Sequence, residues 1–302
     1  METPAPRSAR YFDDWYADMA QTPVKDEIMQ RHLGLPPHLL STSLLGWEGI
    51  GQVTKALRLS AGDLLLDLAC GRGGYGLEIA ARTGARLTGV DFSAEAVRQA
   101  RDSARRLGRE AEFRVGDLAA TGLGTASADA VLCVDAIQFA GDPDAAYREM
   151  RRVLVPGGRA VLTCYEAVDA GDERVVARLR RVNLDAGLTA AGFVNVEVRE
   201  RPGWRAAERA MWKEARALDP GDDPALQSFH GEGVRSLETF GLIRRVMASA
   251  TAPLTNARPQ TPDNPVLPTQ SRDDTDLGWG DRAEPDDDER LLRDRPPHWD
   301  SP

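Results

Sequence analysis

The chain has 302 residues, of which 42% are hydrophobic and 28% charged, and this composition is that of an ordinary globular protein. Its formal net charge is −9, whereas a protein that neutralises many phosphates carries an excess of positive charge. No nucleic acid partner is therefore expected. No apolar run approaches the roughly 18 residues of a membrane span, and the first residues lack the apolar core of a signal peptide. A cytoplasmic protein without a membrane partner is therefore expected.

The two ends of the chain differ in composition from the middle. Residues 1–10 are expected to be disordered, and residues 253–302 are rich in Pro, Asp, Thr and Arg but poor in aliphatic side chains. The segment 257–302 carries 6 Lys and Arg against 12 Asp and Glu, a contribution of −6. We expect a disordered acidic tail. Short apolar islands around Trp279 and Trp299 leave open that it docks a protein partner.

Residues 11–59 are predicted to form helices that cover a sheet as a lid. Apolar side chains recur at helical spacing in 11–20, 25–33 and 43–59, and the sequence LGLPPH interrupts the pattern. The aromatic side chains of this region either belong to the core or shield a bound ligand. The candidates for the substrate side of a site are Tyr11, Tyr16, His32 and Trp47.

Residues 64–80, LLLDLACGRGGYGLEIA, are typical of a buried strand that runs through a glycine-rich turn into a helix. The near-continuous apolar run has the length of a strand and suits a parallel strand covered on both faces. The glycines allow the backbone to approach a ligand closely, and the following helix N-terminus attracts negative charge. A ligand site is therefore predicted at this turn.

The alternation of strands and helices continues to residue 250. Strands are predicted at 86–91, 112–115, 128–135, 159–164, 193–199 and 243–250, and helices at 93–106, 143–154, 173–191, 204–218 and 224–240. Residues 243–250 alternatively end a helix. The pattern predicts an α/β fold with a Rossmann-like, doubly wound, mostly parallel seven-stranded sheet, and residues 60–252 are expected to form this core.

Four of the predicted strands end in or near an aspartate, namely Asp67, Asp91, Asp117 and Asp135. Parallel sheets bind ligands at the carboxyl ends of their strands. Asp91 lies 20 residues after Gly71, the spacing at which a carboxylate on the second strand meets a ribose held over the first turn. Asp67 either fixes the glycine turn or meets an ammonium group of the ligand. Helix-capping, turn and other structural roles are the alternatives for the remaining three.

The segments DLACGRGGYG, GVDFS, GDLAATG and VLVPGGRAVLT resemble, in order and spacing, the motifs of class I S-adenosylmethionine-dependent methyltransferases that act on small molecules. The resemblance covers about residues 60–165. It implies S-adenosyl-L-methionine as cofactor and in-line methyl transfer to an oxygen, nitrogen or carbon of a small, apolar or aromatic acceptor. It places Gly71 and Gly73 at the amino-acid end of the cofactor. The cofactor-binding residues expected are Asp67, Ala69, Gly71, Gly73, Asp91, Phe92, Gly116, Asp117, Leu118, Asp135 and Ala136.

Two other classes of function remain open from the sequence. Gly71, Gly73 and Gly76 also spell the GxGxxG dinucleotide fingerprint, so an NAD-dependent oxidoreductase is one alternative. The other is a regulatory or scaffold protein that binds the cofactor without transferring a methyl group.

The catalytic group remains unassigned at this level. His32, His38 and His230 are candidates for a general base, although packed or surface histidines are the simpler interpretation. No metal site is expected. The three cysteines are expected to be buried free thiols, and they are Cys70, Cys133 and Cys164.

Overall fold

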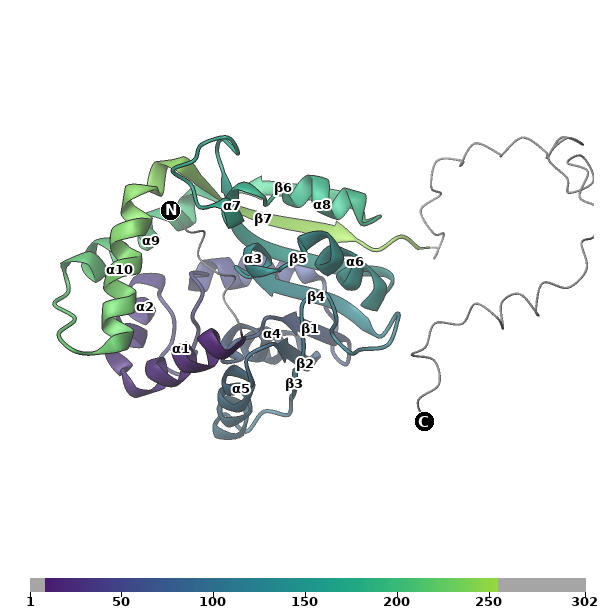
Figure 1. The fold of residues 1–302 in the computed structure, drawn as a ribbon. Helices are drawn as coiled ribbons and strands as arrows, with labels where there is room; N and C mark the ends of the chain where they lie inside the picture. The colour runs from purple at the N-terminus through teal and green to yellow at the C-terminus, as the bar shows by residue number, and fades with distance from the viewer. Residues whose placement is uncertain (1–8, 255–302) are drawn as a thin grey trace, which may run out of the picture. The chain divides into compact units, whose positions relative to one another are not determined.

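A sheet of seven strands forms the centre of residues 9–254, the part of the chain that the computed structural model describes (Figure 1). The strands are β1 (Leu64–Leu68), β2 (Arg86–Asp91), β3 (Glu112–Val115), β4 (Ala128–Val134), β5 (Leu154–Ala167), β6 (Val194–Glu200) and β7 (Ile243–Thr251). Their order is β3-β2-β1-β4-β5-β7-β6, and only β7 runs antiparallel to its neighbours. The predicted Rossmann-like fold is confirmed, including the strand at 243–250. Disorder was predicted for 1–10 and 253–302; residues 1–8 and 255–302 of these segments lie outside the described residues, whereas Ala9 and Arg10 belong to α1.

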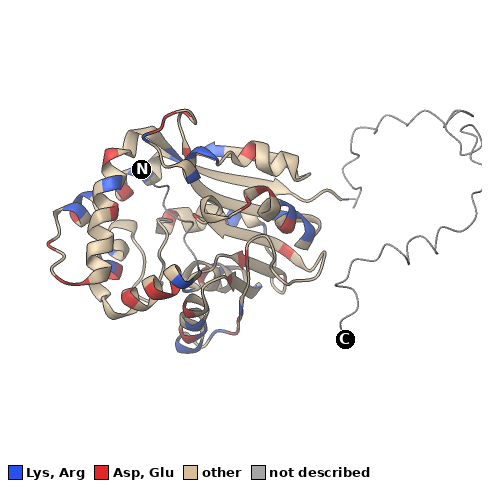
Figure 2. Ribbon diagram, viewed as in Figure 1, with Lys and Arg blue, Asp and Glu red and all other residues tan. Residues whose placement is uncertain are grey.

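Helices cover both faces of the sheet. They are α1 (Ala9–Gln21), α2 (Pro23–Leu33), α3 (Trp47–Leu57), α4 (Gly74–Thr83), α5 (Ala94–Arg106), α6 (Pro143–Val153), α7 (Ala177–Arg180), α8 (Leu184–Ala190), α9 (Pro202–Ala217) and α10 (Pro224–Glu238), with 3-10 turns η1 (Ile137–Phe139) and η2 (Phe240–Leu242). Successive strand residues point to opposite faces. Leu65 packs in one apolar core with α3, α4 and α5, and Leu66 packs in a second core with α6 and α8. Charged side chains gather on the helices and loops (Figure 2).

Helices α1, α2, α9 and α10 lie together at one end of the sheet, where they form a helical lid (Figure 1). Thr22 Oγ1, just before α2, donates to Asp223 at the start of α10 over 2.6 Å. His32 on α2 lies 2.6 Å from a carboxylate oxygen of Glu214 on α9. The lid therefore combines segments from both ends of the described chain, whereas α3 packs against the sheet.

The segment before α3 departs from the sequence prediction, which began a helix at residue 43. Helix α3 begins at Trp47, because side chains of the core hold the preceding backbone in an extended course. The Tyr75 hydroxyl donates to the Ser43 oxygen over 2.7 Å and accepts from the Leu45 nitrogen over 3.1 Å. The Leu44 nitrogen donates to a carboxylate oxygen of Asp135. This segment reaches the ends of the strands instead of continuing the lid.

Two further boundaries differ from the prediction. The single helix expected at 173–191 is two short helices, α7 and α8, because the Asn183 side chain accepts from the Ala186 nitrogen and starts a new helix. The strand predicted at 159–164 is longer in the structure, where β5 runs from Leu154 to Ala167 and passes Gly157 with a positive φ of 81°. The carboxyl end of β5 therefore lies three residues later than predicted.

Candidate functional site

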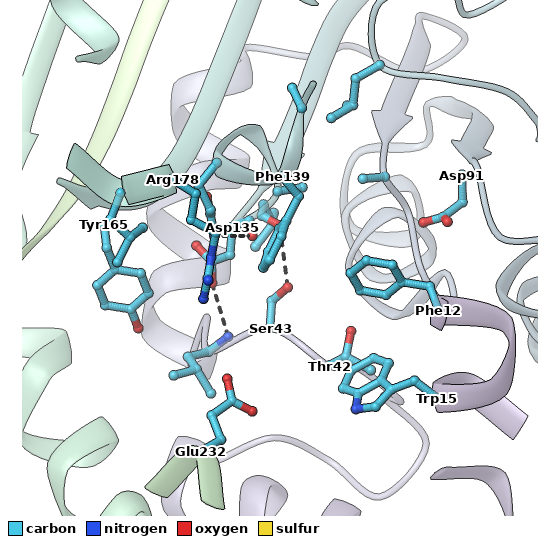
Figure 3. Close-up of a pocket in the computed structure, with 18 of the residues that line it drawn as sticks. Phe12, Trp15, Thr42, Ser43, Asp91, Asp135, Phe139, Tyr165, Arg178 and Glu232 are labelled. Carbon is cyan, nitrogen blue, oxygen red and sulfur yellow. Dashed lines mark hydrogen bonds between the residues drawn. The ribbon is translucent and has the colours of Figure 1, made fainter. Parts of the chain in front are cut away.

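A cavity of about 270 Å³ lies at the carboxyl ends of the strands, under the helical lid. This volume is close to the lower end of the range for small-molecule sites. Figure 3 shows Asp91, at the end of β2, and Tyr165, on β5, on opposite sides of the cavity, with Asp135 and Ser43 between them. The cavity therefore spans the part of the sheet where parallel α/β folds bind ligands.

The structure brings most of the predicted cofactor-binding residues to this one cavity. Those that line it are Ala69, Asp91, Phe92, Gly116, Asp117, Leu118, Asp135 and Ala136. They come from the ends of β1, β2, β3 and β4, so residues that are far apart in the sequence meet at one edge of the sheet. Asp67, Gly71 and Gly73 do not line the cavity.

Asp91 connects the cavity wall to the glycine turn. Its Oδ2 accepts a hydrogen bond from the Gly71 nitrogen at 2.8 Å, and its Oδ1 accepts from the Ser93 nitrogen at 2.9 Å. Burial raises the pKa of this carboxyl to about 6, although the backbone hydrogen bonds oppose the rise. A carboxylate offers about four acceptor sites, so Asp91 keeps capacity for a ligand on the cavity side.

The glycine turn packs against the lid rather than opening into the cavity. Gly71 has a φ of 52°, and a Cβ atom there would lie 2.8 Å from the Tyr16 hydroxyl. A Cβ atom on Gly74 would lie 2.2 Å from the Leu40 oxygen. The Gly73 nitrogen donates to the Cys70 oxygen over 2.9 Å. The glycines thus allow Tyr16 of the lid to pack closely on the glycine turn and the segment before α3 to pack closely on the first turn of α4.

Asp67 supports this turn from behind. It is only 3% exposed, and its side chain lies against Gly76 in the first turn of α4, where a Cβ atom would approach Oδ2 to 2.6 Å. Burial, followed by the nearby Asp91 charge, raises the pKa of Asp67 to about 8, although a hydrogen bond from the Gly76 backbone opposes the rise. A neutral carboxyl that is packed against α4 fits the role of fixing the turn better than a countercharge for an ammonium group.

Asp135 belongs to a buried ionic network under the cavity. Arg245 on β7, which is fully buried, donates to Oδ1 over 2.5 Å and to Oδ2 over 2.8 Å. Thr163 Oγ1 also donates to Oδ1, over 2.7 Å. Glu208 on α9 lies 3.3 Å from the Arg245 Nε, and the Arg245 guanidinium lies 4.4 Å from the ring centre of Tyr165. The Asp135 carboxylate is therefore largely engaged by the protein.

The four candidates for the substrate side separate into two groups. Tyr11 and Tyr16 on α1 line the cavity. His32 lies outside it, beside Glu214 on the outer part of the lid. Trp47 also lies outside and is 42% exposed, with the Arg82 guanidinium 4.1 Å from its ring centre.

Several cavity residues were not anticipated from the sequence. They are Thr42, Ser43 and Leu44 from the segment before α3, Gln138 and Phe139 from η1, Tyr165 from β5, and Glu232 and Arg235 from α10. Gln138, Phe139 and Tyr165 carried a usable signal, because each lies at the carboxyl side of a predicted parallel strand. The cavity residues of the segment before α3 and of helix α10 could not be found from the sequence, because only tertiary packing brings them to the cavity.

Residues 9–254 contain no cluster of three or more His, Cys, Asp or Glu side chains placed to hold a metal ion. No helix in the same range is long and apolar enough to cross a membrane. The cysteines at 70, 133 and 164 are buried free thiols, as predicted.

Comparison with protein families and known sequences identifies relatives of this chain. The model of a methyltransferase domain matches residues 65–158. The 27-O-demethylrifamycin SV methyltransferase of Amycolatopsis mediterranei is 32% identical over 183 residues, which are 54% of this chain and 67% of the relative. A ubiquinone biosynthesis O-methyltransferase of Xanthomonas axonopodis is 39% identical over 106 residues, but this match spans 34% of the chain and only 43% of the relative.

Comparison with solved structures supports the fold. Phosphoethanolamine N-methyltransferase 2 of Haemonchus contortus, solved with S-adenosyl-L-methionine, has a TM-score of 0.60 to this chain at 20% identity. The match covers 69% of this chain and 53% of the other. At this identity the likeness concerns the fold and leaves the acceptor open.

Proposed function

Since the chain belongs to the class I S-adenosylmethionine-dependent methyltransferases, we propose that it transfers a methyl group from S-adenosyl-L-methionine to a small-molecule acceptor. The observation that carries the proposal is the position of Asp91, a carboxylate on the cavity wall at the end of β2 whose oxygens also fix the glycine turn. Two alternatives remain: a protein that binds the cofactor at this site without transferring a methyl group, and an oxidoreductase that binds NAD there. The experiment below distinguishes them.

The residues over β1, β2 and β3 fit this cofactor. Asp91 has acceptor sites left for the two ribose hydroxyls, and a charge-assisted hydrogen bond of this kind contributes about 1.5 to 3 kcal/mol. Phe92 and Leu118 offer apolar surface to the adenine ring, beside the Asp117 carboxylate, which can accept from an exocyclic amine. The small side chains of Ala69 and Ala136 leave room for the cofactor on the side of the cavity toward β4.

The other half of the cavity lies over β4, β5 and β7 and fits an acceptor. When bound, the cofactor supplies a methyl group that its sulfonium has already activated. The protein's part is then mainly to hold the acceptor nucleophile in line with that group, and such positioning lowers a barrier by roughly 7 to 11 kcal/mol. Phe12 and Trp15 of α1 line the cavity from the lid, on the side of Asp91 (Figure 3).

Glu232 is the cavity carboxylate that fits the role of taking up the acceptor's proton. Asp91, Asp117 and Asp135 each accept hydrogen bonds from the protein. Within residues 9–254, neither oxygen of Glu232 accepts a hydrogen bond, its charge acts on the buried Lys25, and Figure 3 shows its carboxylate directed into the cavity. No histidine lines this cavity in the described part of the chain, so we assign the proton to a Glu232 oxygen.

Calorimetric titration of the purified chain with S-adenosylmethionine, S-adenosylhomocysteine and NAD tests the proposal. We expect micromolar binding of the two adenosyl-sulfur ligands and none of NAD. Binding of NAD alone contradicts the cofactor assignment. Release of S-adenosylhomocysteine during a screen of small hydroxyl, amine and carbon acceptors then tests transfer, and a chain that binds the cofactor but methylates nothing supports the regulatory alternative.

A further inference from the structure

A second hollow, of about 380 Å³, lies between helix α3 and the edge strand β6. Met247 and Ser249 of β7, the strand beside β6, also line it, and it shares no lining residue with the cavity described above. Its charged side chains are those of Lys55 on α3, Arg58 just after α3, Arg159 on β5, Glu197 and Arg199 on β6, and Arg201 just after β6. We call this site the basic hollow, because it gathers five cations and one carboxylate.

Most of these cations have no counter-ion in the described part of the chain. Glu197 pairs with Arg199, two positions along β6, and both side chains are exposed. Within residues 9–254, the side chains that form no ion pair are Lys55, Arg58, Arg159 and Arg201. With one carboxylate against five cations, the basic hollow carries an excess of four positive charges.

The cations of the basic hollow lie close enough to influence one another. Burial, followed by the positive charge of Arg58, lowers the pKa of Arg159, although the charge of Glu197 opposes this. The hydrogen bond and the charge of Arg199 lower the pKa of Glu197. The charges of Arg159 and Arg201 lower it further. Three arginines thus share one carboxylate, and a bound anion relieves the repulsion that remains.

Two of the arginines are held in place and still have donors to offer. Arg159 Nε donates to the Ala56 oxygen over 3.3 Å, and its Nη1 donates to Thr251 Oγ1 over 2.6 Å. Arg201 Nη2 lies 3.7 Å from Met247 Sδ. Arg159 Nη2 and Arg201 Nη1 have no partner among residues 9–254, and neither is buried, unlike the Arg201 Nε. A guanidinium that is already oriented loses less side-chain entropy when it binds a ligand.

The composition of the basic hollow indicates the chemistry of its ligand. Guanidinium groups bind phosphate oxygens through paired N–H donors. The cations come from the end of α3, from β5, from β6 and from the residue after β6, so a chain of phosphates contacts more of them than a single phosphate does. In the described structure no aromatic side chain lines the hollow, so it offers no surface on which a nucleobase stacks.

We propose that the basic hollow is a second ligand site, which binds a compact polyphosphate through Arg58, Arg159 and Arg201. The site recognises the phosphate chain alone, so inorganic triphosphate and the triphosphate of a nucleotide bind in the same way. This inference is independent of the proposed function, because none of these residues lines the methyl-transfer cavity.

Calorimetric titration of the full-length protein with inorganic triphosphate tests this inference. The buffer contains no phosphate and no divalent cation, and its ionic strength is held constant because salt screens exposed charges. We expect one site per chain with submillimolar affinity. Uridine triphosphate, whose base differs from the adenine of the proposed cofactor, should bind within about threefold of inorganic triphosphate, and orthophosphate should bind at least about tenfold more weakly.

Arg58→Gln removes one cation of the basic hollow. Arg58 is exposed and its side chain forms no hydrogen bond with the described residues, so the fold should be unaffected. We expect triphosphate to bind at least about fivefold more weakly to this variant. Arg106→Gln on α5 is the matched control, because Arg106 is likewise exposed and without an ion pair among residues 9–254. Its affinity should stay within about twofold of the wild type.

Glu197→Gln should change the affinity in the opposite direction. The substitution removes the carboxylate of the basic hollow and releases Arg199, so we expect triphosphate to bind about threefold more tightly. Glu112→Gln on β3 is the control. Glu112 pairs with Arg114 two positions along its strand, as Glu197 does with Arg199, and both carboxylates have 56% exposed side chains. Triphosphate affinity should not change in this control.

The remaining outcomes oppose the inference. A wild type that binds no triphosphate overturns it, and so does equal affinity for triphosphate and orthophosphate. Equal losses in Arg58→Gln and Arg106→Gln show that binding follows the overall charge of the protein. Equal gains in Glu197→Gln and Glu112→Gln show the same. Much tighter binding of uridine triphosphate than of inorganic triphosphate shows that the base is recognised and that the ligand lies elsewhere.

Discussion

Arg245 on β7 donates to both carboxylate oxygens of Asp135, a residue 110 positions earlier at the end of β4. Both side chains are buried, and Arg245 has no exposed surface. Although burial lowers the pKa of Arg245, the neighbouring Asp135, Tyr165 and Glu208 raise it above its ordinary value, so the guanidinium stays charged. The floor of the cavity is thus an ion pair across strands that do not touch in the sheet order.

Breaking this pair should strongly destabilise the protein. Arg245→Met leaves Asp135 buried without its cation and Glu208 with Arg205 alone, and we expect a loss of about 3 to 5 kcal/mol in the free energy of unfolding, measured by urea denaturation. Arg199→Gln on the adjacent strand β6 is the control, because its partner Glu197 is exposed and such pairs contribute about 0 to 1 kcal/mol. Similar losses in both variants contradict a structural role for the buried pair.

Asp135 shows where the sequence prediction stops. Its position at the end of a parallel strand was readable from the apolar run before it, and the structure does place it at the cavity. The pairing of Asp135 with Arg245 could not be predicted, because nothing in the local sequence distinguishes Arg245 from the neighbouring Arg244.

The ranges of the strands were predictable because buried parallel strands are continuous apolar runs. The course of residues 41–46 was not, because the hydroxyl of Tyr75 on α4 fixes it.

Asp91 should control cofactor affinity. Asp91→Asn keeps one acceptor oxygen but loses the charge, and we expect S-adenosylhomocysteine to bind at least about tenfold more weakly by calorimetry. Asp102→Asn on the outer face of α5 is the control, since Asp102 contacts only Arg98 and Arg105 in the described structure. Unchanged affinity in Asp91→Asn refutes the assignment to the ribose.

The pH dependence of cofactor binding follows from the same residue. The pKa of Asp91 is raised to about 6, so the carboxylate that accepts hydrogen bonds is lost as the pH falls through that value. We expect the dissociation constant of S-adenosylhomocysteine to rise below pH 6, by up to about tenfold per pH unit. Asp91→Asn should bind with little dependence on pH between 5 and 7. A wild type that shows no such dependence contradicts the ionised carboxylate as the binding form.

Asp67→Asn separates the two roles that the sequence left open for Asp67. Because the pKa of Asp67 is raised to about 8, its carboxyl is mostly neutral at pH 7, and asparagine is a close substitute. We expect cofactor affinity within about twofold of the wild type. A tenfold loss supports the alternative, a charged partner for the ligand's ammonium group.

The pH dependence of the wild type's stability provides a second test of the raised pKa of Asp67. A folded-state pKa raised above the unfolded value means that the folded state binds the proton more tightly, so this contribution to stability is lost progressively as the pH rises from about 4 to about 8. The melting temperature of the wild type should therefore fall as the pH rises toward about 8 and level off above it, and it should fall less in Asp67→Asn. Parallel curves for the two proteins contradict the raised pKa.

Glu232→Gln should lower turnover while leaving the cofactor site intact. With any acceptor that supports methyl transfer, we expect kcat to fall by roughly 10² to 10⁴, the range for loss of a general base. The rate should also depend more steeply on pH, since reaction then requires an acceptor that has already ionised. Binding of S-adenosylhomocysteine should stay unchanged. Glu238→Gln at the end of the same helix is the control, and an equal loss in both variants argues for a general effect of charge on α10.

Gly74→Ala tests whether the segment before α3 depends on close contact with the first turn of α4. Alanine normally stabilises a helix by about 0.5 to 1 kcal/mol relative to glycine. Here its Cβ atom would lie 2.2 Å from the Leu40 oxygen, so the backbone before α3 must shift. We therefore expect the opposite sign, a loss of about 1 to 3 kcal/mol by urea denaturation. At Gly141 a Cβ atom meets nothing within 4 Å, and Gly141→Ala should be nearly neutral. A stabilised Gly74→Ala would mean that residues 40–46 move away from α4 without loss, and that close contact with α4 does not hold this segment in place.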